Sequence, residues 1–250
     1  MVKDGFVWEG DSYEGLTCNF MEYLASAGGS PTNSDYSKAT LDSPAAVKAV
    51  AFMRGLITSG ASPVAVTTFQ EPQAMNTFGA GNAAFLRNWG YAYQDAITPA
   101  DGGKLTASQV GVAVLPTFQG QPSPGYSNIG GWNLYINPHS KNIAADLTFI
   151  KWMAGIQAET ILAVKYSVGS TVTAVRTSPA VIASSPVFAV APKARLVPRP
   201  AGTPNYPALS TAIYQNLNGA LAGSMSPSAA VSAMQPGVTS ALSSTSNGGL

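Results

Sequence analysis

The sequence predicts an α/β fold that is built mainly from long helices. Of its 250 residues 46% are hydrophobic, which is enough to form a sizeable core. Apolar residues recur at helical spacing in at least six segments, whereas short apolar runs that end at Pro or Gly predict only a few strands. Long helices with scattered strands favour an α/β architecture over a β-sandwich.

The helices follow from apolar spacing and from residues that begin or end a helix. Residues 13–27 place their apolar side chains near one helical face. Ser43 is a suitable N-cap and Pro44 suits the first turn, so a second helix is expected from there to a stop at Gly60. Further helices are expected over residues 68–78, 144–153, 158–166, 206–221 and 227–242.

Three segments are predicted to form strands. Residues 83–86 form a short apolar run that leads into Arg87. Residues 110–115 are rich in valine and stop at a proline, which predicts a buried strand, and residues 132–136 alternate towards another proline.

Composition excludes several classes of function. The 13 Lys and Arg residues balance 12 Asp and Glu residues, so no basic excess is present for binding nucleic acid. Cys18 is the single cysteine and His139 the single histidine, which rules out an internal disulfide and a His-based metal cluster. We expect Cys18 in the core and His139 in an exposed turn.

No cofactor or metal is expected. Residues 79–84 formally fit the pattern Gly-x-Gly-x-x-Ala, but they follow a helix and precede a strand, the reverse of a dinucleotide site. The patterns Gly-x-Ser-x-Gly and Ser-x-x-Lys of serine hydrolases are absent. Acidic residues gather in the first two dozen positions, so a carbohydrate hydrolase that uses Glu14 and Glu22 as paired carboxylates stays an alternative.

Two aromatic clusters stand out. Residues 87–93, with the sequence RNWGYAY, combine three rings with a guanidinium and an amide, and residues 130–133, with the sequence GGWN, place a Trp after two glycines. Aromatic faces stack on the C–H faces of sugars, and amides and guanidinium groups bind hydroxyls, so both clusters suit a carbohydrate. From spacing alone, the alternative that Trp89 and Trp132 are core residues is favoured.

Several stretches together resemble the extracellular solute-binding proteins of bacterial sugar ABC importers, most closely the trehalose- and maltose-binding type. The resemblance covers about residues 6–242, and its specificity lies in the order and spacing of the stretches. They are residues 13–20, 67–71, 78–83, 85–93, 110–116, 120–123, 130–134, 199–200 and 206–210.

The resemblance implies a periplasmic-binding-protein-like fold, in which two α/β lobes hold a sugar in the cleft between them. It implies that Trp89 and Tyr91 contact the sugar by ring stacking and through a hydroxyl, and that residues 130–132 form the opposing wall of the cleft. It also implies that the guanidinium of Arg199 binds sugar hydroxyls, with Arg176 as the weaker of the two arginine candidates. The residues so assigned are Trp89, Tyr91, Gly130, Gly131, Trp132, Asn133, Arg199 and Arg176. It further implies an oligosaccharide ligand, permease subunits as partners, no enzymatic activity and an extracytoplasmic location, either periplasmic or as a cell-surface lipoprotein.

The resemblance also sets the expected domain organisation. The chain would comprise an essentially complete C-terminal lobe with only part of the N-terminal lobe, as a fragment without the secretion signal. Residues 1–114 and 167–242 would form the C-terminal lobe, residues 115–166 would cross to the other lobe, and residues 243–250 would be a flexible tail. An apolar patch around Ile136, Leu147 and Ile150 could then make the chain self-associate, a third possibility.

Overall fold

The computed structural model describes residues 2–243, which divide by their contacts into two compact units. Within the described residues, unit 1 comprises residues 2–88, 114–129 and 194–243, and unit 2 comprises residues 89–113 and 130–193. The predicted tail lies, apart from Ser243, outside the described residues. The lobe boundaries expected after residues 114, 166 and 242 concern a longer protein and stay predictions.

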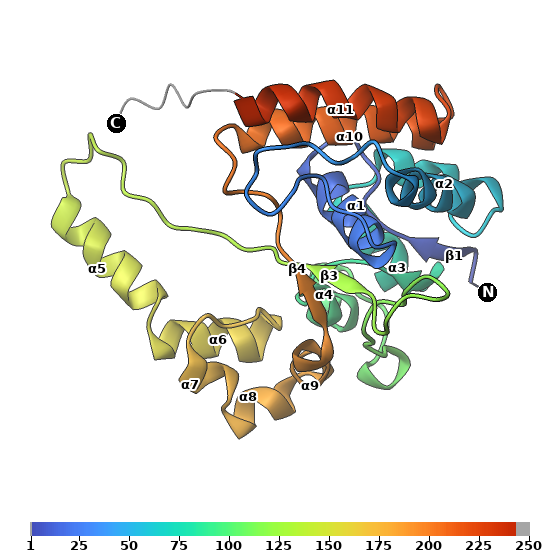
Figure 1. The fold of residues 1–250 in the computed structure, drawn as a ribbon. Coiled ribbons are helices and arrows are strands. Elements are labelled where there is room, and N and C mark those ends of the chain that lie inside the picture. The colour runs from blue at the N-terminus through green and yellow to red at the C-terminus, as the bar shows by residue number, and fades with distance from the viewer. Residues whose placement is uncertain (1, 244–250) are drawn as a thin grey trace. The chain divides into compact units, whose positions relative to one another are not determined.

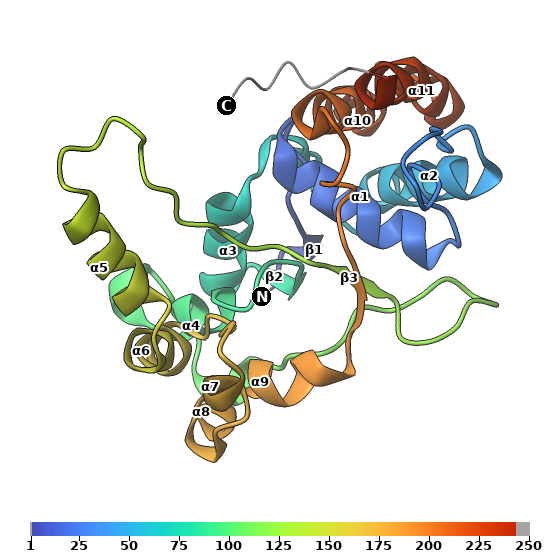
Figure 2. The ribbon, with the colours of Figure 1, turned by 60° about the vertical axis from the view of Figure 1, so that its left-hand side comes forward.

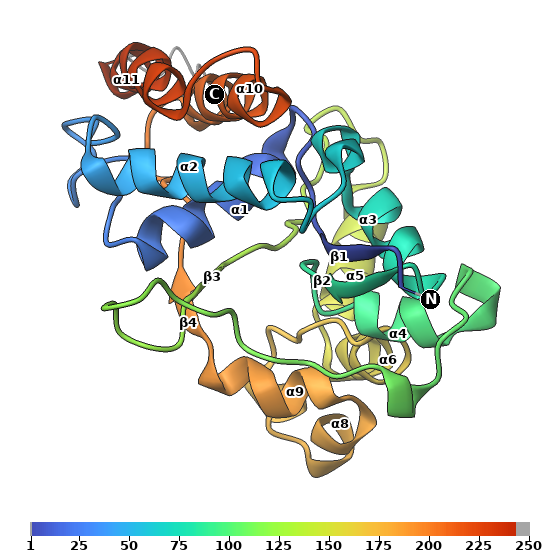
Figure 3. The ribbon, with the colours of Figure 1, turned by 90° about the vertical axis from the view of Figure 1, so that its right-hand side faces the viewer.

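Four long helices form the core of unit 1. They are α1 (Glu14–Ser26), α2 (Pro44–Thr58), α10 (Tyr206–Ala222) and α11 (Pro227–Ser243), each at or within three residues of its predicted place. Figures 1 and 3 show α10 and α11 side by side. Helix α10 packs on α1 and α2, and α11 packs on α2. The Ser43 Oγ accepts a hydrogen bond from the Ala46 N–H at 3.2 Å, which confirms the predicted cap of α2.

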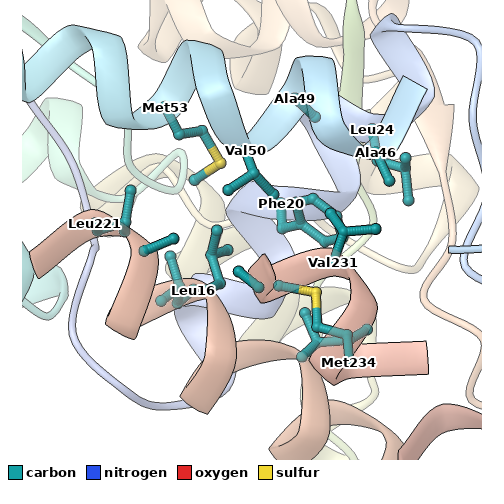
Figure 4. Packing of buried hydrophobic residues seen from close by; sticks show 14 of the residues in the cluster. Leu16, Phe20, Leu24, Ala46, Ala49, Val50, Met53, Leu221, Val231 and Met234 are labelled. Atoms are coloured by element: carbon teal, nitrogen blue, oxygen red, sulfur yellow. The ribbon is translucent and has the colours of Figure 1, made fainter. Parts of the chain in front are cut away.

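The interface between these helices is closely packed and apolar. Leu16 and Phe20 of α1 belong to one buried cluster with Val50 and Met53 of α2 and Met234 of α11, and Figure 4 shows part of this cluster. Each of these five side chains is fully buried. Burial of a Leu, Val, Phe or Met side chain contributes about 1.5–3 kcal/mol, so this cluster supplies much of the stability of unit 1.

Two small parallel sheets complete unit 1. In the first, β1 (Asp4–Val7) pairs with β2 (Ala83–Leu86), with Phe6 opposite Phe85, and α3 (Glu71–Gly79) packs on both strands. In the second, β3 (Tyr126–Asn128) pairs with β4 (Arg195–Val197). A 3₁₀ turn at Val64–Thr68 precedes α3, so the helix begins three residues later than predicted.

Of the three predicted strands, one is confirmed and two are wrong. Residues 83–86 form β2 as expected, but residues 110–115 and 132–136 are irregular. A strand requires a neighbouring backbone to pair with, and neither segment has such a ladder among the described residues. The pairing partners of β1 and β3 lie about 70 to 80 residues away in the sequence, which local pattern does not reveal.

Unit 2 contains the remaining helices. They are α4 (Ala92–Ile97), α5 (Ile143–Met153), α6 (Ile156–Tyr166), α7 (Thr173–Arg176), α8 (Pro179–Ser184) and α9 (Pro186–Val190). Short 3₁₀ turns lie at Pro99–Asp101, Ala107–Gln109 and Ala191–Lys193. Figure 2 shows α5 leading into α6, both near their predicted places, with α7 to α9 following. A small core joins Ala163, Val175 and Val181.

Helix α5 is apolar but not covered. None of its residues, all of which the structure describes, is buried, and Leu147, Phe149 and Trp152 are about half exposed. Ile136 and Ile150 of the patch expected from the sequence are partly exposed as well. Among residues 2–243 no single helix is long and apolar enough to cross a membrane, and α5 with α6, bent by 54°, reaches that length only as a pair.

The contrast between α1 and α5 predicts different costs for the same substitution. Leu16→Ala removes a fully buried side chain and should lower the free energy of unfolding by about 2–5 kcal/mol. Leu147→Ala removes a side chain that is 43% exposed and should cost less than about 1 kcal/mol. Urea unfolding followed by far-UV circular dichroism measures both. A cost for Leu147→Ala equal to that for Leu16→Ala would mean that another surface covers α5 in solution.

Candidate functional site

The first aromatic cluster begins where β2 ends. The Arg87 N–H donates to the Val7 carbonyl at 3.0 Å and continues the pairing of β2 with β1. The chain then enters unit 2 at Trp89, whose carbonyl accepts a hydrogen bond from the Ala92 N–H at 3.0 Å as α4 begins. The side chains of Trp89 and Tyr91 are both half-buried.

The second cluster meets the first within unit 2. A Cβ atom placed on Gly130 would lie 2.7 Å from Cζ3 and 2.8 Å from Cη2 of Trp89. The indole of Trp89 therefore lies directly against the Gly130 backbone, at a distance that only glycine permits. A Cβ atom on Gly131 would meet nothing within 4 Å. The structure thus brings together two residues that the sequence separates by 41 positions.

Trp132 and Asn133 extend from this contact into solvent. Trp132 is fully exposed, at 101% of its reference area, and Asn133 is exposed too. The alternative that Trp132 is a core residue is therefore wrong, because the segment that carries it has no neighbouring strand to cover it. Tyr135, which the sequence analysis did not select, is 85% exposed and adds a further ring to this segment.

The two candidate arginines lie in different units. Arg199 in unit 1 forms an ion pair with Glu14, with 2.8 Å between Nη1 and Oε1, and its guanidinium carbon lies 6.0 Å from the ring centroid of Tyr206. Arg176 in unit 2 is exposed and donates a long hydrogen bond of 3.4 Å to the Thr173 hydroxyl. Arg199 is therefore the more firmly oriented of the two.

Glu14 is the centre of a polar cluster on α1. Besides Arg199, the hydroxyls of Tyr206 and Ser210 donate to its carboxylate. Burial and the hydrogen bond to Glu14 raise the pKa of Tyr206 above its ordinary value. Cys18 lies one helical turn after Glu14, and burial raises the pKa of its thiol to about 12. Its buried position confirms the prediction for Cys18, and His139 is exposed in a turn, as expected.

A buried ion network lies at the ends of the paired strands of unit 1. Arg87 donates from Nε and Nη2 to the two oxygens of Glu22, at 2.9 and 2.7 Å, and from Nη1 to Glu9 Oε2 at 2.9 Å. The amide of Asn19 donates to Glu9 at 2.8 Å, and the Asn128 backbone N–H donates to Glu22 at 2.9 Å. No more than 6% of any of these five residues is exposed.

Sequence reasoning missed this network. Its signal was present, because Glu9 lies two residues after the end of β1 and Arg87 directly follows β2. Opposite charges at the same ends of two parallel strands meet in space, but the pairing of β1 with β2 had to be known first. Among the described residues no group of three His, Cys, Asp or Glu side chains could hold a metal ion.

The acidic pair of the hydrolase alternative is already engaged. Both oxygens of Glu22 accept hydrogen bonds from Arg87, and Oε1 also accepts one from the Asn128 N–H. Glu14 accepts from Arg199, Tyr206 and Ser210. A general acid or base must reach its substrate, and these contacts give the hydrolase alternative no support.

Comparison with known proteins assigns the chain to one class. Residues 3–160 match the family model of the bacterial extracellular solute-binding proteins, and the chain belongs to that family. A probable ABC transporter-binding protein from Deinococcus radiodurans is 37% identical over 185 residues, which are 74% of this chain and 42% of the relative.

Solved structures confirm the periplasmic-binding-protein-like fold. Maltose-bound MalE3 of T. maritima matches with a TM-score of 0.84 and 32% identity, over 94% of this chain and 60% of that one. A solute-binding protein from Agrobacterium radiobacter K84 in complex with ribitol matches with a TM-score of 0.78 and 25% identity, over 95% and 59%. The chain therefore spans less than two thirds of the length of these relatives.

The glycine that lies against Trp89 yields a matched pair of variants. Gly130→Ala should push the indole out of its place, because the new Cβ would otherwise lie 2.7 Å from the ring. Gly131→Ala has open space and should leave the ring undisturbed. Tryptophan emission and near-UV circular dichroism measure the difference. Equal spectra for the two variants would contradict the contact between Gly130 and Trp89.

The buried position of Glu9 predicts a pH dependence of stability. Burial raises the pKa of its carboxyl above the ordinary value of 4.5, although Arg87 and Asn19 act against this shift. Folding therefore favours the neutral form of Glu9. The contribution of neutral Glu9 to the free energy of unfolding is present at low pH and is lost as the pH rises through the raised pKa. Glu9→Gln stays neutral, so the free energy of unfolding should fall more steeply with rising pH in the parent than in the variant. Urea unfolding from pH 4.5 upwards tests this, and parallel declines would contradict it.

Proposed function

We propose that this chain is part of the substrate-binding component of a carbohydrate ABC importer, with an α-linked di- or oligosaccharide of the maltose or trehalose kind as its ligand. The observation that carries the proposal is the aromatic site of unit 2. The indole of Trp89 lies against Gly130, and Trp132 follows two residues later with its whole ring exposed.

The chemistry of this site suits an uncharged ligand. Exposed indole and phenol rings offer apolar faces to the C–H groups of a pyranose, and Asn133 supplies an amide that both donates and accepts. The net charge of the chain is +1, so little long-range field is present to attract an ionic solute. Membership of the solute-binding family and the likeness to a maltose-bound structure support the same ligand class.

Arg199 is proposed as a second contact, and Arg176 as a weaker one. The ion pair with Glu14 fixes the direction of the Arg199 guanidinium, while its side chain keeps 25% of its surface exposed for a hydroxyl. The guanidinium of Arg199 carries five N–H groups, and it donates a hydrogen bond from Nη1 to Glu14. Tyr91 and Gly131 complete the proposed set of ligand residues.

The wider role follows from the family. We propose that the whole protein acts outside the cytoplasm, as a periplasmic protein or a lipoprotein, and delivers sugar to permease subunits in the membrane without altering it. The relative described as a probable ABC transporter-binding protein supports this assignment. Because the chain spans about 60% of its solved relatives, fewer contacts are available and weak affinity is expected.

Sugar titration of the chain tests the proposal. Maltose, trehalose and maltotriose should change tryptophan emission with Kd on the order of 1 mM, equivalent to about −4 kcal/mol. Trp89→Ala and Trp132→Ala should each weaken binding about tenfold, because stacking on a ring contributes on the order of 1 kcal/mol. Isothermal titration calorimetry would give the same ranking of variants.

A matched control separates stacking from general effects of losing an indole. Trp152→Ala removes a ring from α5 that is 49% exposed and lies outside the proposed site, so it should leave sugar affinity unchanged. Binding that is equally weak in the Trp152 and Trp132 variants would contradict the proposed site. The absence of binding by every α-linked sugar at concentrations well above about 1 mM would overturn the proposed ligand class for this chain.

A further inference from the structure

Two of the points where the chain passes from unit 1 to unit 2 lead directly to the aromatic site. One crossing follows Asn88 and brings in Trp89, and the other follows Ile129 and brings in Gly130. In each case an anchored residue of unit 1 stands two positions before the site residue. Arg87 precedes Trp89, and Asn128 precedes Gly130.

Both anchors are bound to the same side chain. The carboxylate of Glu22 accepts two hydrogen bonds from the Arg87 guanidinium, at 2.9 and 2.7 Å, and one from the Asn128 backbone N–H, at 2.9 Å. Glu22, Arg87 and Asn128 are 5%, 5% and 6% exposed, so water competes little for these bonds. Hydrogen bonds to a charged group that is shielded from water are the strongest that a protein makes.

Strand pairing cannot replace this link. Arg87 continues the ladder of β2 with β1, whereas Asn128 belongs to β3, which pairs with β4. In the described part of the chain these are two separate two-stranded sheets, with no backbone ladder between β2 and β3. Glu22, on α1, therefore connects the end of one sheet to the end of the other through one carboxylate.

The link through Glu22 matters for the site because only two residues of chain separate each anchor from its site residue. Two residues of extended chain span at most about 7 Å, so a fixed separation of Arg87 and Asn128 strongly limits where Trp89 and Gly130 can lie. The indole of Trp89 in turn lies so close to Gly130 that a Cβ there would not fit. The contact between Trp89 and Gly130 requires the two segments to lie close together, and Glu22 limits the separation of the anchors from which these segments start.

We propose that Glu22 is a positioning residue for the aromatic site: it holds the segments that carry Trp89 and Gly130 at the spacing the site needs. This role in ligand recognition rests on the proposed function, whereas the positioning itself does not. The hydrogen bonds of Glu22 go to Arg87 and Asn128, so its effect on the site is transmitted through these two anchors.

Accessibility of Trp89 to a quencher measures the positioning directly, without any sugar. In the full chain carrying Trp132→Phe and Trp152→Phe, only Trp8 and Trp89 remain, and Trp8 is fully buried with its indole N–H bonded to Ser62 at 3.0 Å. Acrylamide quenching then reports mainly on Trp89. Glu22→Gln should raise the quenching constant at least about twofold, because the amide NH₂ cannot accept the hydrogen bond from Arg87.

Two further variants guard against simple loss of stability. Arg87→Lys keeps the positive charge but loses the two-pronged contact with Glu22, so it should loosen Trp89 in the same way. Met53→Ala removes a fully buried side chain that touches neither anchor, and it should lower stability without raising the quenching of Trp89. Quenching in Glu22→Gln and Arg87→Lys no greater than in Met53→Ala would overturn the proposal.

Sugar titration of the parent chain and of Glu22→Gln, both with Trp132 and Trp152 retained, separates this proposal from the proposed function. If Glu22→Gln exposes Trp89 while the parent binds no sugar, the positioning stands and the proposed function fails. If the parent binds sugar and Glu22→Gln binds it equally well despite a loosened Trp89, the claim that positioning serves recognition is overturned. Weaker binding in Glu22→Gln together with a loosened Trp89 is the expected result.

Discussion

The arrangement of unit 1 depends on one guanidinium that binds two buried carboxylates. Arg87 binds Glu9 and Glu22, and all three side chains are almost completely withdrawn from water. Removing an ion from water costs several kcal/mol, and that cost is offset only when geometry and further hydrogen bonds are good. The polar contacts from Asn19 and Asn128 supply those bonds. The network is complete at Glu22, whereas Oε1 of Glu9 has no hydrogen-bond partner among the described residues, and through Glu22 it ties Arg87 and Asn128 to α1.

This constraint acts on an otherwise apolar unit. The helices α1, α2, α10 and α11 pack through side chains that make non-directional contacts, which set proximity but not register. A network of charged hydrogen bonds is directional, and it places Arg87, directly after β2, and Asn128, at the end of β3, beside Glu22 on α1. Apolar burial thus stabilises unit 1, and the buried charges define its geometry where the chain leaves it.

The sequence predicted the helices well and the sheets and site only in part. Helix periodicity is local, so the expected positions of α1, α2, α5, α6, α10 and α11 are confirmed within three residues. Strands depend on distant partners: residues 110–115 have the valine content of a strand but no ladder in the described chain, while β3 and β4 carry no strong pattern and pair across about 70 residues. For the same reason the meeting of Glu9, Glu22 and Arg87 could not be foreseen.

The aromatic clusters show what spacing can and cannot tell. Two glycines before Trp132 indicated open space around the ring, and its full exposure agrees with this. The same pattern did not reveal that the first glycine is needed for a different indole, that of Trp89. Glycine has no side chain of its own to suggest a partner, so a requirement for it shows only when the neighbouring chain is in place. The sequence could therefore name the residues of the candidate site, whereas the contact that joins Trp89 to Gly130 follows from the fold.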